Sequence, residues 1–252
     1  MSDTLTETLP ILFQDEHLVA INKPTALLVH RSEIDRHETR FALQLVRDQI
    51  GQRVYPLHRL DKPTSGVLLF ALSPEIAKAM GEQFTTNQIR KQYIAVVRGY
   101  APENGIIDHA LKEELDKYTD KKARLNNPPK EAVTHFQRLA TVELDVEIER
   151  YPQSRYSLVQ CQPQTGRKHQ IRRHMKHISH PIIGDAKHGK GVHNRYFKQH
   201  LDAGRLLLHA SQLTFNHPVN GEGITLNAPI DDTLRQLFQR FNWLHSLPKE
   251  WQ

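Results

Sequence analysis

The sequence predicts an α+β domain with a mixed, mostly antiparallel sheet flanked by helices and loops. Strand-like apolar runs outnumber helical patterns, and the two do not alternate strictly, which argues against a doubly wound parallel sheet. The 252 residues are 38% hydrophobic and 25% charged, a balance typical of a globular chain that buries a large core. This composition excludes a disordered, a collagen-like and a coiled-coil protein.

The first elements are two short strands and a helix. Residues 1–10 are expected to form a tail, and residues 11–22 two strands around a turn at 14–16. A helix is expected over 39–50, because Gly51 supplies a stop signal.

A strand pair and a second helix follow. Residues 54–59 and 66–72 are strand-like and are joined by Asp-Lys-Pro-Thr-Ser at 61–65, which has the composition of a turn. The helix begins after Ser73, a good N-cap residue, with Pro74 at the first helical position. Its inward side chains are expected to be Ile76, Met80 and Phe84.

The rest of the chain is rich in strands. They are expected over 92–98, 133–142, 156–161, 206–209, 212–215 and 224–227. Asn-Asn-Pro-Pro at 126–129 predicts a loop and a candidate hinge. The last helix begins near Asp231 and Asp232. It is expected to bury Leu234, Leu237, Phe238 and Phe241.

One further helix is amphipathic with a cationic face. Its buried stripe, at spacings of three and four, is formed by Ile171, His174, Met175 and Ile178. The opposite face carries His169, Arg172, Arg173 and Lys176. Because the helix follows Thr165 and Gly166, its free N–H groups favour an anion, and a phosphate or carboxylate is expected nearby.

The positive charge is concentrated in the same region. Lysine and arginine outnumber the acids 34 to 28, and residues 150–184 contain no acid at all. Such a block favours RNA as a partner. The predicted backbone contacts are Arg167, Lys168, Arg173, Lys176, Lys187, Lys190 and Arg195, with Tyr196 and Phe197 for stacking. The alternative is a solvated helix face followed by a basic loop.

Several classes of protein are disfavoured. With Cys161 as the single cysteine, no intramolecular disulfide is possible, which is typical of a reducing compartment and predicts a cytoplasmic location. No signal peptide or membrane span is expected, because no apolar run approaches about 18 residues. Glycine-rich nucleotide loops and GxSxG are missing, so neither a nucleotide cofactor nor acyl transfer is supported.

A histidine cluster raises the question of a metal. His169, His174, His177 and His180 suggest zinc, but no acid lies nearby in the sequence, and we predict no metal site. A histidine-metal hydrolase stays as an alternative, which would bind zinc and lose activity with a chelator.

The nine residues HRLDKPTSG at 58–66 carry the most chemical information. By itself the string describes a turn in which Asp61 bonds its own backbone. Followed by GVLLF, however, it resembles the segment around the catalytic aspartate of the RluA-type RNA pseudouridine synthases. The resemblance continues in order through further blocks at 11–30, 91–99, 165–174, 180–185 and 206–218.

The resemblance implies a pseudouridine synthase fold and a cofactor-free isomerisation of uridine in RNA. Asp61 would be the nucleophile, attacking either C1′ of the ribose or C6 of the base, with no second acid beside it. Arg172 would pair with Asp61 and favour its charged form, although it could instead bind a phosphate.

Two further residues acquire roles from the resemblance. Tyr93 would stack on the target base and take part in the late removal of the C5 proton, whereas its pattern alone also fits a core tyrosine. Arg59 would fill the space left by the flipped base, the alternative being a surface salt bridge.

The domain organisation and the substrate are also implied. We expect one catalytic domain over 11–252 without a separate S4-type RNA-binding domain, and no obligate protein partner. The stretches 113–124, 30–36 and 184–195 are similar to the tRNA-acting subfamily that modifies uridine 65 in the T-stem. Lys168 and Arg173 differ from the residues that the family usually has at these positions. We therefore expect this chain to bind its RNA differently in this helix, which bears on the choice of substrate. Alternatives are a synthase acting on ribosomal RNA and a non-catalytic RNA-binding protein of the same fold.

Overall fold

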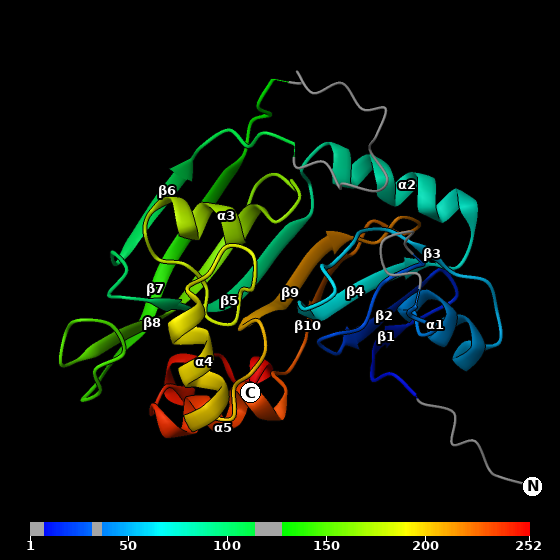
Figure 1. Ribbon diagram of the computed structural model, residues 1–252. Coiled ribbons are helices and arrows are strands. Elements are labelled where there is room, and N and C mark those ends of the chain that lie inside the picture. Colours follow the sequence, from blue (N-terminus) through cyan, green and yellow to red (C-terminus); the bar gives the residue numbers. More distant parts are fainter. Residues whose placement is uncertain (1–7, 32–36, 114–127) are drawn as a thin grey trace, which may run out of the picture.

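The computed structural model describes residues 8–31, 37–113 and 128–252 (Figure 1). Ten strands form one sheet with the order β1-β2-β4-β9-β5-β8-β7-β6, while β10 pairs with β9 and β3 with β4. Every pairing is antiparallel except that of β4 with β9. The predicted α+β fold with a mixed, mostly antiparallel sheet is confirmed.

The strands are β1 (Ile11–Gln14), β2 (Leu18–Lys23), β3 (Tyr55–Pro56), β4 (Ser65–Ala71), β5 (Arg90–Arg98), β6 (Asn104–Asp108), β7 (Val133–Leu144), β8 (Ser154–Pro163), β9 (Leu208–Asn216) and β10 (Gly223–Asn227). The helices are α1 (Ala42–Ile50), α2 (Pro74–Thr85), α3 (Gln170–His177), α4 (Gly191–His200) and α5 (Asp232–Arg240), followed by two 3-10 turns, η1 (Leu244–Ser246) and η2 (Lys249–Trp251).

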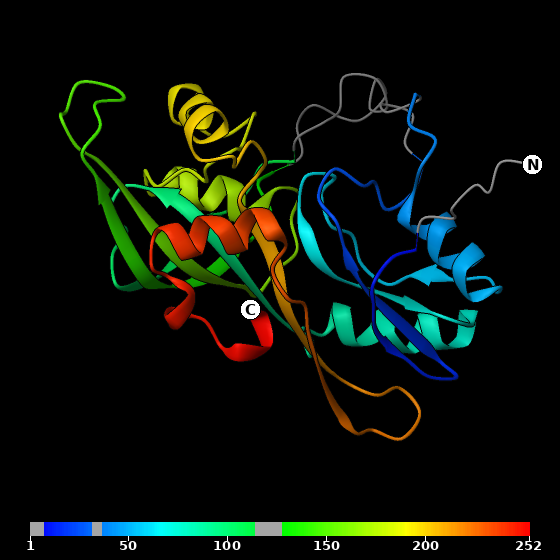
Figure 2. The same cartoon turned by 90° about the horizontal axis from the view of Figure 1, so that it is seen from below.

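Helices cover both faces of the sheet (Figure 2). The first half of the sheet, around β2 and β4, and the second half, around β5 and β8, therefore have two hydrophobic cores each. In the first half, α1 packs on one side of β2 and β4, and α2 on the other. In the second half, α3 packs on one side of β5 and β8, while α4 and α5 belong to the core on the other side. Burial on both faces explains why all seven residues of β4 are buried and why residues 67–71 form an unbroken apolar run.

The two halves of the sheet meet where β4 runs parallel to β9. Gly66 of β4 pairs with Ala210 of β9, and a Cβ on Gly66 would lie 2.2 Å from the Ala210 carbonyl oxygen. Gly66 also has φ +116°, a conformation that side chains disfavour. Glycine is therefore required where the strand that follows Asp61 joins the central strand.

Most predicted elements are present, with shifted ends. Gly51 ends α1 in the left-handed conformation, and the side chains of Ser73 and Asp231 accept the N-terminal hydrogen bonds of α2 and α5. Two predictions were wrong in detail. The strands predicted at 206–209 and 212–215 are one continuous strand, β9, which begins only at Leu208. The predicted strand at 54–59 shrinks to the two residues of β3, because 57–64 forms the turn of the site.

Three features were missed or misassigned. Sequence analysis did not find β6, which has only five residues, or α4, whose segment reads as a basic loop. Phe197 of α4 is fully buried against Tyr156 and Phe241, so the prediction that it stacks on RNA was wrong. Cys161 is a strand residue as expected, and burial raises the pKa of its thiol to about 12.

No helix in the described ranges is both long enough and apolar enough to cross a membrane.

Two histidines, the buried His209 and the half-buried His58, are expected to make the fold sensitive to acid. Burial lowers the pKa of His58 and of His209 from 6.5 to about 4. Between pH 6.5 and pH 4 the unfolded chain therefore binds protons that the folded chain excludes, and the free energy of unfolding falls as the pH falls. For His209 this amounts to about 3 kcal/mol, which urea unfolding at pH 7 and pH 4.5 measures.

The control separates these histidines from general acid effects. His209→Gln removes the group whose pKa is lowered and is expected to flatten the fall in unfolding free energy. His200→Gln, on the exposed end of α4, is expected to leave the fall unchanged. An equal pH dependence in wild type and His209→Gln would contradict the prediction.

Candidate active site

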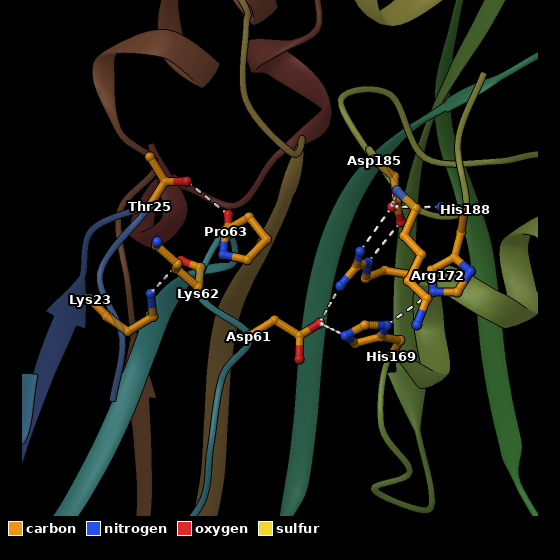
Figure 3. A network of polar contacts seen from close by, with 10 residues as sticks. Lys23, Thr25, Asp61, Lys62, Pro63, His169, Arg172, Asp185 and His188 are labelled. Carbon is orange, nitrogen blue, oxygen red and sulfur yellow. Dashed lines mark hydrogen bonds and ion pairs between the residues drawn. The ribbon is translucent and has the colours of Figure 1, made fainter. Parts of the chain in front are cut away.

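Asp61 lies in the turn between β3 and β4, and the N-terminal segment holds this turn through hydrogen bonds (Figure 3). The Thr64 N–H donates to the Asp61 carbonyl at 3.0 Å. Thr25 donates through its hydroxyl to the Pro63 carbonyl at 2.8 Å. The buried Lys23 ammonium donates to the carbonyls of Pro24, Leu27 and Lys62.

Burial of Lys23 disfavours the charged form of its ammonium group. Burial lowers the pKa of Lys23 to about 7, although the negative charge of Asp61 opposes that shift. Its three donors are all used on backbone carbonyls, one of them in the residue after Asp61. Lys23 therefore supports the turn that carries the catalytic candidate.

A second set of contacts fixes the other end of the turn. Ser65 donates to Nδ1 of His209 at 2.9 Å and accepts from Arg205 at 3.0 Å. His209 in turn donates from Nε2 to the Ala228 carbonyl at 3.0 Å, and Arg205 pairs with Asp231 at 2.8 Å. These contacts connect the turn to the C-terminal part of the chain.

Arg172 of α3 reaches across to Asp61 and bridges two carboxylates. Its Nη1 donates to Oδ2 of Asp61 at 2.8 Å, while Nε and Nη2 donate to Asp185 at 2.7 and 2.9 Å. The Arg172 side chain is 7% exposed and that of Asp61 29%, so the ion pair lies where the turn opens to solvent. Arg172 thus belongs to the site and is not part of a solvated cationic face.

Asp185 was missed in the sequence as a site residue. Its side chain is 1% exposed and also accepts from the Lys187 and His188 N–H groups, both at 2.9 Å. Burial would raise the pKa of Asp185, but the hydrogen bonds from Arg172 and His188 hold it below its usual value. The available signal was its place as the first acid after the acid-free stretch 150–184.

The sequence-based statement that no second acid accompanies Asp61 needs correction. Asp185 lies on the far side of Arg172 and is engaged by that guanidinium and two N–H groups. It positions Arg172 and does not face Asp61 as the second carboxylate of a glycosidase would.

His169 completes the surroundings of Asp61. Its Nε2 lies 3.8 Å from Oδ2 of Asp61, and its Nδ1 lies 3.0 Å from Nε2 of His188. His169 is the residue that precedes α3, and its backbone has φ +55°. The Asp61 carboxylate is the anion that lies near this helix start. The contacts come from the side chains of His169 and Arg172.

The turn before α3 is held by Gln170, another residue that the sequence did not single out. Its Nε2 donates to Val133 O and Thr134 Oγ1, and its Oε1 accepts from the Arg167 N–H, all at 3.0 Å. Gln170 therefore fixes the segment that presents His169 and Arg172.

A cavity of about 760 Å³ opens over this network. Asp61, Arg59, Tyr93, His169 and Arg172 all line it, so the structure brings together the four residues predicted for catalysis and substrate binding. Its volume accommodates a nucleoside-sized group.

Tyr93 and Arg59 lie at the cavity in different ways. Tyr93 is half-buried and packs against the cores of both halves of the sheet, so its predicted core role and its place at the site coexist. Burial and the charge of Asp61 raise the pKa of Tyr93, which keeps the phenol protonated. Arg59 is exposed, and in the described part of the chain no carboxylate pairs with it.

The predicted backbone contacts lie on the surface around α3 and α4. Those that are exposed are Arg167, Lys168, Lys176, Lys187, Lys190 and Arg195, and Arg173 is half-buried. Arg167 lines the cavity and donates to the Glu131 carbonyl. Lys190 pairs with Glu149 at 3.3 Å.

The histidine cluster of α3 is used in packing. His174 contacts Thr134 and the His109 carbonyl, His177 stacks on His109, and His180 contacts the Arg98 carbonyl. Among the residues that the structure describes, no group of three or more histidine, cysteine or acidic side chains is arranged to hold a metal.

Parts of four predicted segments lie outside the described residues. They are 1–7 of the tail at 1–10, 32–36 of the 30–36 stretch, 114–124 of the 113–124 stretch, and residues 126 and 127 of the predicted loop.

The fold is that of a pseudouridine synthase. The family model for RNA pseudouridylate synthase matches residues 17–177, and the chain belongs to this family of isomerases. A solved structure, human RNA pseudouridylate synthase domain containing 4, has a TM-score of 0.71 and 27% identity, covering 92% of this chain and 93% of its own.

Curated relatives are more similar in sequence. A Pectobacterium carotovorum protein described as tRNA pseudouridine synthase C is 56% identical over 96% of this chain. This chain spans 64% of the length of that protein. Another of the same description, from Vibrio parahaemolyticus, is 53% identical over 96% of this chain and 98% of its own length.

Proposed function

We propose that this chain converts uridine to pseudouridine in tRNA, with Asp61 as the nucleophile. The observation that carries the proposal is the Asp61–Arg172 ion pair of 2.8 Å at a nucleoside-sized cavity. Two relatives above 50% identity, both described as tRNA pseudouridine synthase C, support tRNA as the substrate. Uridine 65 in the T-stem is the target favoured by the subfamily resemblance.

The reaction rearranges one nucleoside without gain or loss of atoms. The C1′–N1 bond breaks, the uracil turns, a C1′–C5 bond forms, and the C5 proton leaves as N1 gains one. Asp61 supplies a carboxylate oxygen that bonds transiently to C1′ or C6. Arg172 favours the ionised, nucleophilic form of this carboxylate, and Asp185 holds Arg172 in place.

Tyr93 and Arg59 are proposed to handle the flipped base. Uridine must leave the RNA stack, which costs a few kcal/mol, and a half-buried ring beside Asp61 offers a stacking surface. Tyr93 would also take part in the late removal of the C5 proton, and burial together with the charge of Asp61 raises the pKa of its phenol. Arg59, exposed at the cavity, is placed to fill the vacated space.

We further propose that the chain acts as one catalytic domain. The predicted boundary at residue 11 needs correction, because Leu9 is buried in the core beside α1 and its backbone N–H and carbonyl bond the Gln49 side chain. The chain would act in the cytoplasm, without a cofactor, a metal or an obligate protein partner. RNA capture then depends on the basic residues around the cavity.

The test is to map pseudouridine in tRNA and ribosomal RNA, by carbodiimide-based detection, in cells with and without the gene. We expect one tRNA site to disappear, and to return with wild type but not with Asp61→Ala. Loss of a ribosomal-RNA site would overturn the substrate. No change at any site would favour a non-catalytic RNA-binding protein.

Binding to tRNA is expected to weaken steeply as salt increases. Phosphate contacts release counterions, so log affinity should fall linearly with log salt, with a slope of about 0.9 for each contact. Lys176→Gln and Arg195→Gln remove exposed charges of α3 and α4, and each should reduce the slope by about one contact.

Lys78→Gln is the matched control, because Lys78 is equally exposed but lies on α2 in the other half of the molecule. It should leave the slope unchanged. If the affinity for tRNA does not change between about 50 and 200 mM salt, the basic surface does not contribute to RNA binding.

A further inference from the structure

Five residues form a closed circuit around the catalytic candidate, in which His188 takes part through both its backbone N–H and its ring (Figure 3). Asp61 contacts Arg172, Arg172 contacts Asp185, and Asp185 accepts the N–H of His188. His188 contacts His169 at 3.0 Å, and His169 returns to Asp61 at 3.8 Å. The side of the circuit formed by Arg172 and Asp185 is explained by the proposed reaction, whereas the two histidines have no role in it.

Both arms of the circuit end on the same oxygen of Asp61. Arg172 Nη1 and His169 Nε2 each approach Oδ2, at 2.8 and 3.8 Å. Oδ1 takes part in neither contact, and in Figure 3 it points away from both side chains. Arg172 hydrogen-bonds Oδ2, and His169 faces the same oxygen at a longer, electrostatic distance, so Oδ1 is the oxygen left for another group.

The backbone places His169 in this position at a cost. Its φ of +55° and ψ of +26° are in the left-handed region, which non-glycine residues enter with an energetic penalty. Such conformations persist where surrounding contacts enforce them, often at functional sites. Here Gln170 fixes the preceding turn and His188 fixes the ring.

The contact between the two rings determines where the protons lie. One proton is shared between His169 Nδ1 and His188 Nε2, because two lone pairs at 3.0 Å would repel. The negative carboxylate favours an N–H on His169 Nε2. In the neutral tautomer that satisfies both contacts, His188 therefore donates to His169, and His169 directs its own N–H toward Asp61.

From this geometry we infer that His169, aligned by His188, is a positioning residue for the nucleophile. The pair holds Oδ2 of Asp61 together with Arg172, so that Oδ1 faces the substrate. The inference rests on the proposed function and adds two residues to it. A misplacement of about 1 Å in a reacting group lowers turnover by about 100-fold, which sets the scale of the expected effect.

The experiment compares variants that keep or remove the critical donor. Gln places an N–H near the position of histidine Nε2, whereas Met has similar length and no donor. His188→Met and His169→Met are compared with His188→Gln and His169→Gln. His177→Met is the control, because His177 lies at the far end of α3 from His169 and stacks on His109 outside the circuit.

The measurements are kcat and KM for pseudouridine formation in tRNA, the Kd for tRNA, and thermal unfolding. We expect both Met variants to lower kcat by about 10- to 100-fold with KM and Kd within about twofold of wild type. The Gln variants should recover a large part of kcat, and His177→Met should match wild type.

Three results would overturn the inference. They are an unchanged kcat in the Met variants, equal losses in the Gln and Met variants, and a loss confined to KM or Kd. His188 is buried, so thermal unfolding shows whether its variants fold; if His188→Met does not fold, His169→Met decides the outcome. Wild type that forms no pseudouridine would refute the proposed function, whereas an active wild type with active Met variants would refute only this inference.

Discussion

Asp61→Asn is expected to abolish pseudouridine formation while leaving tRNA binding intact. The amide has nearly the same shape as the carboxylate but is not a nucleophile, and loss of a nucleophile lowers turnover by about 10⁴-fold or more. Arg172 keeps its two hydrogen bonds to Asp185, so the fold should tolerate the change. The measurement is single-turnover conversion of uridine in tRNA, together with the Kd for the same RNA.

Glu38→Gln is the matched control for this variant. Glu38 is an exposed acid that pairs at 2.8 Å with Lys62, the residue next to Asp61, but it does not line the cavity. It should retain wild-type turnover. Substantial conversion by Asp61→Asn with normal RNA binding would refute the assignment of the nucleophile.

Arg172→Met is expected to have the second-largest effect, on turnover and stability together. Removing preorganised charge beside a reacting group lowers turnover by about 10² to 10³-fold, whereas the Kd for tRNA should change little. The variant also leaves Asp185, 1% exposed, as a buried carboxylate without its guanidinium. Breaking a buried ion pair in this way costs about 3–5 kcal/mol of unfolding free energy.

The double variant Arg172→Met with Asp185→Asn separates the two effects. The amide introduced in place of the Asp185 carboxylate would be neutral and could still accept from the His188 N–H, so the free energy of unfolding should recover largely. Turnover should stay low, because Asp61 still lacks its ion pair. Equal losses of turnover and RNA affinity in the single variant would instead identify Arg172 as a phosphate contact.

Local patterns in the sequence were sufficient for most of the fold. Gly51, Ser73 and Asp231 mark helix ends through local hydrogen bonds and backbone conformation, and these signals are complete within a few residues. The motif around Asp61 was equally legible, because its nine residues are contiguous. Local sequence did not indicate that the two strands predicted within 206–215 form the single strand β9. That strand is defined by its pairing with β5 and β10, and β5 is distant in the chain.

The sequence by itself determined the fold class, the family resemblance, the catalytic candidate Asp61 and the location of the positive charge. Only the tertiary structure decided that Arg172 turns into the cleft, that Asp185 holds it, and that His169 and His188 close a circuit on Asp61. Arg172 lies 111 residues from Asp61 in the chain. Helical periodicity gives the direction of such a side chain relative to its own helix, but the identity of what faces it depends on how the two halves of the sheet pack together.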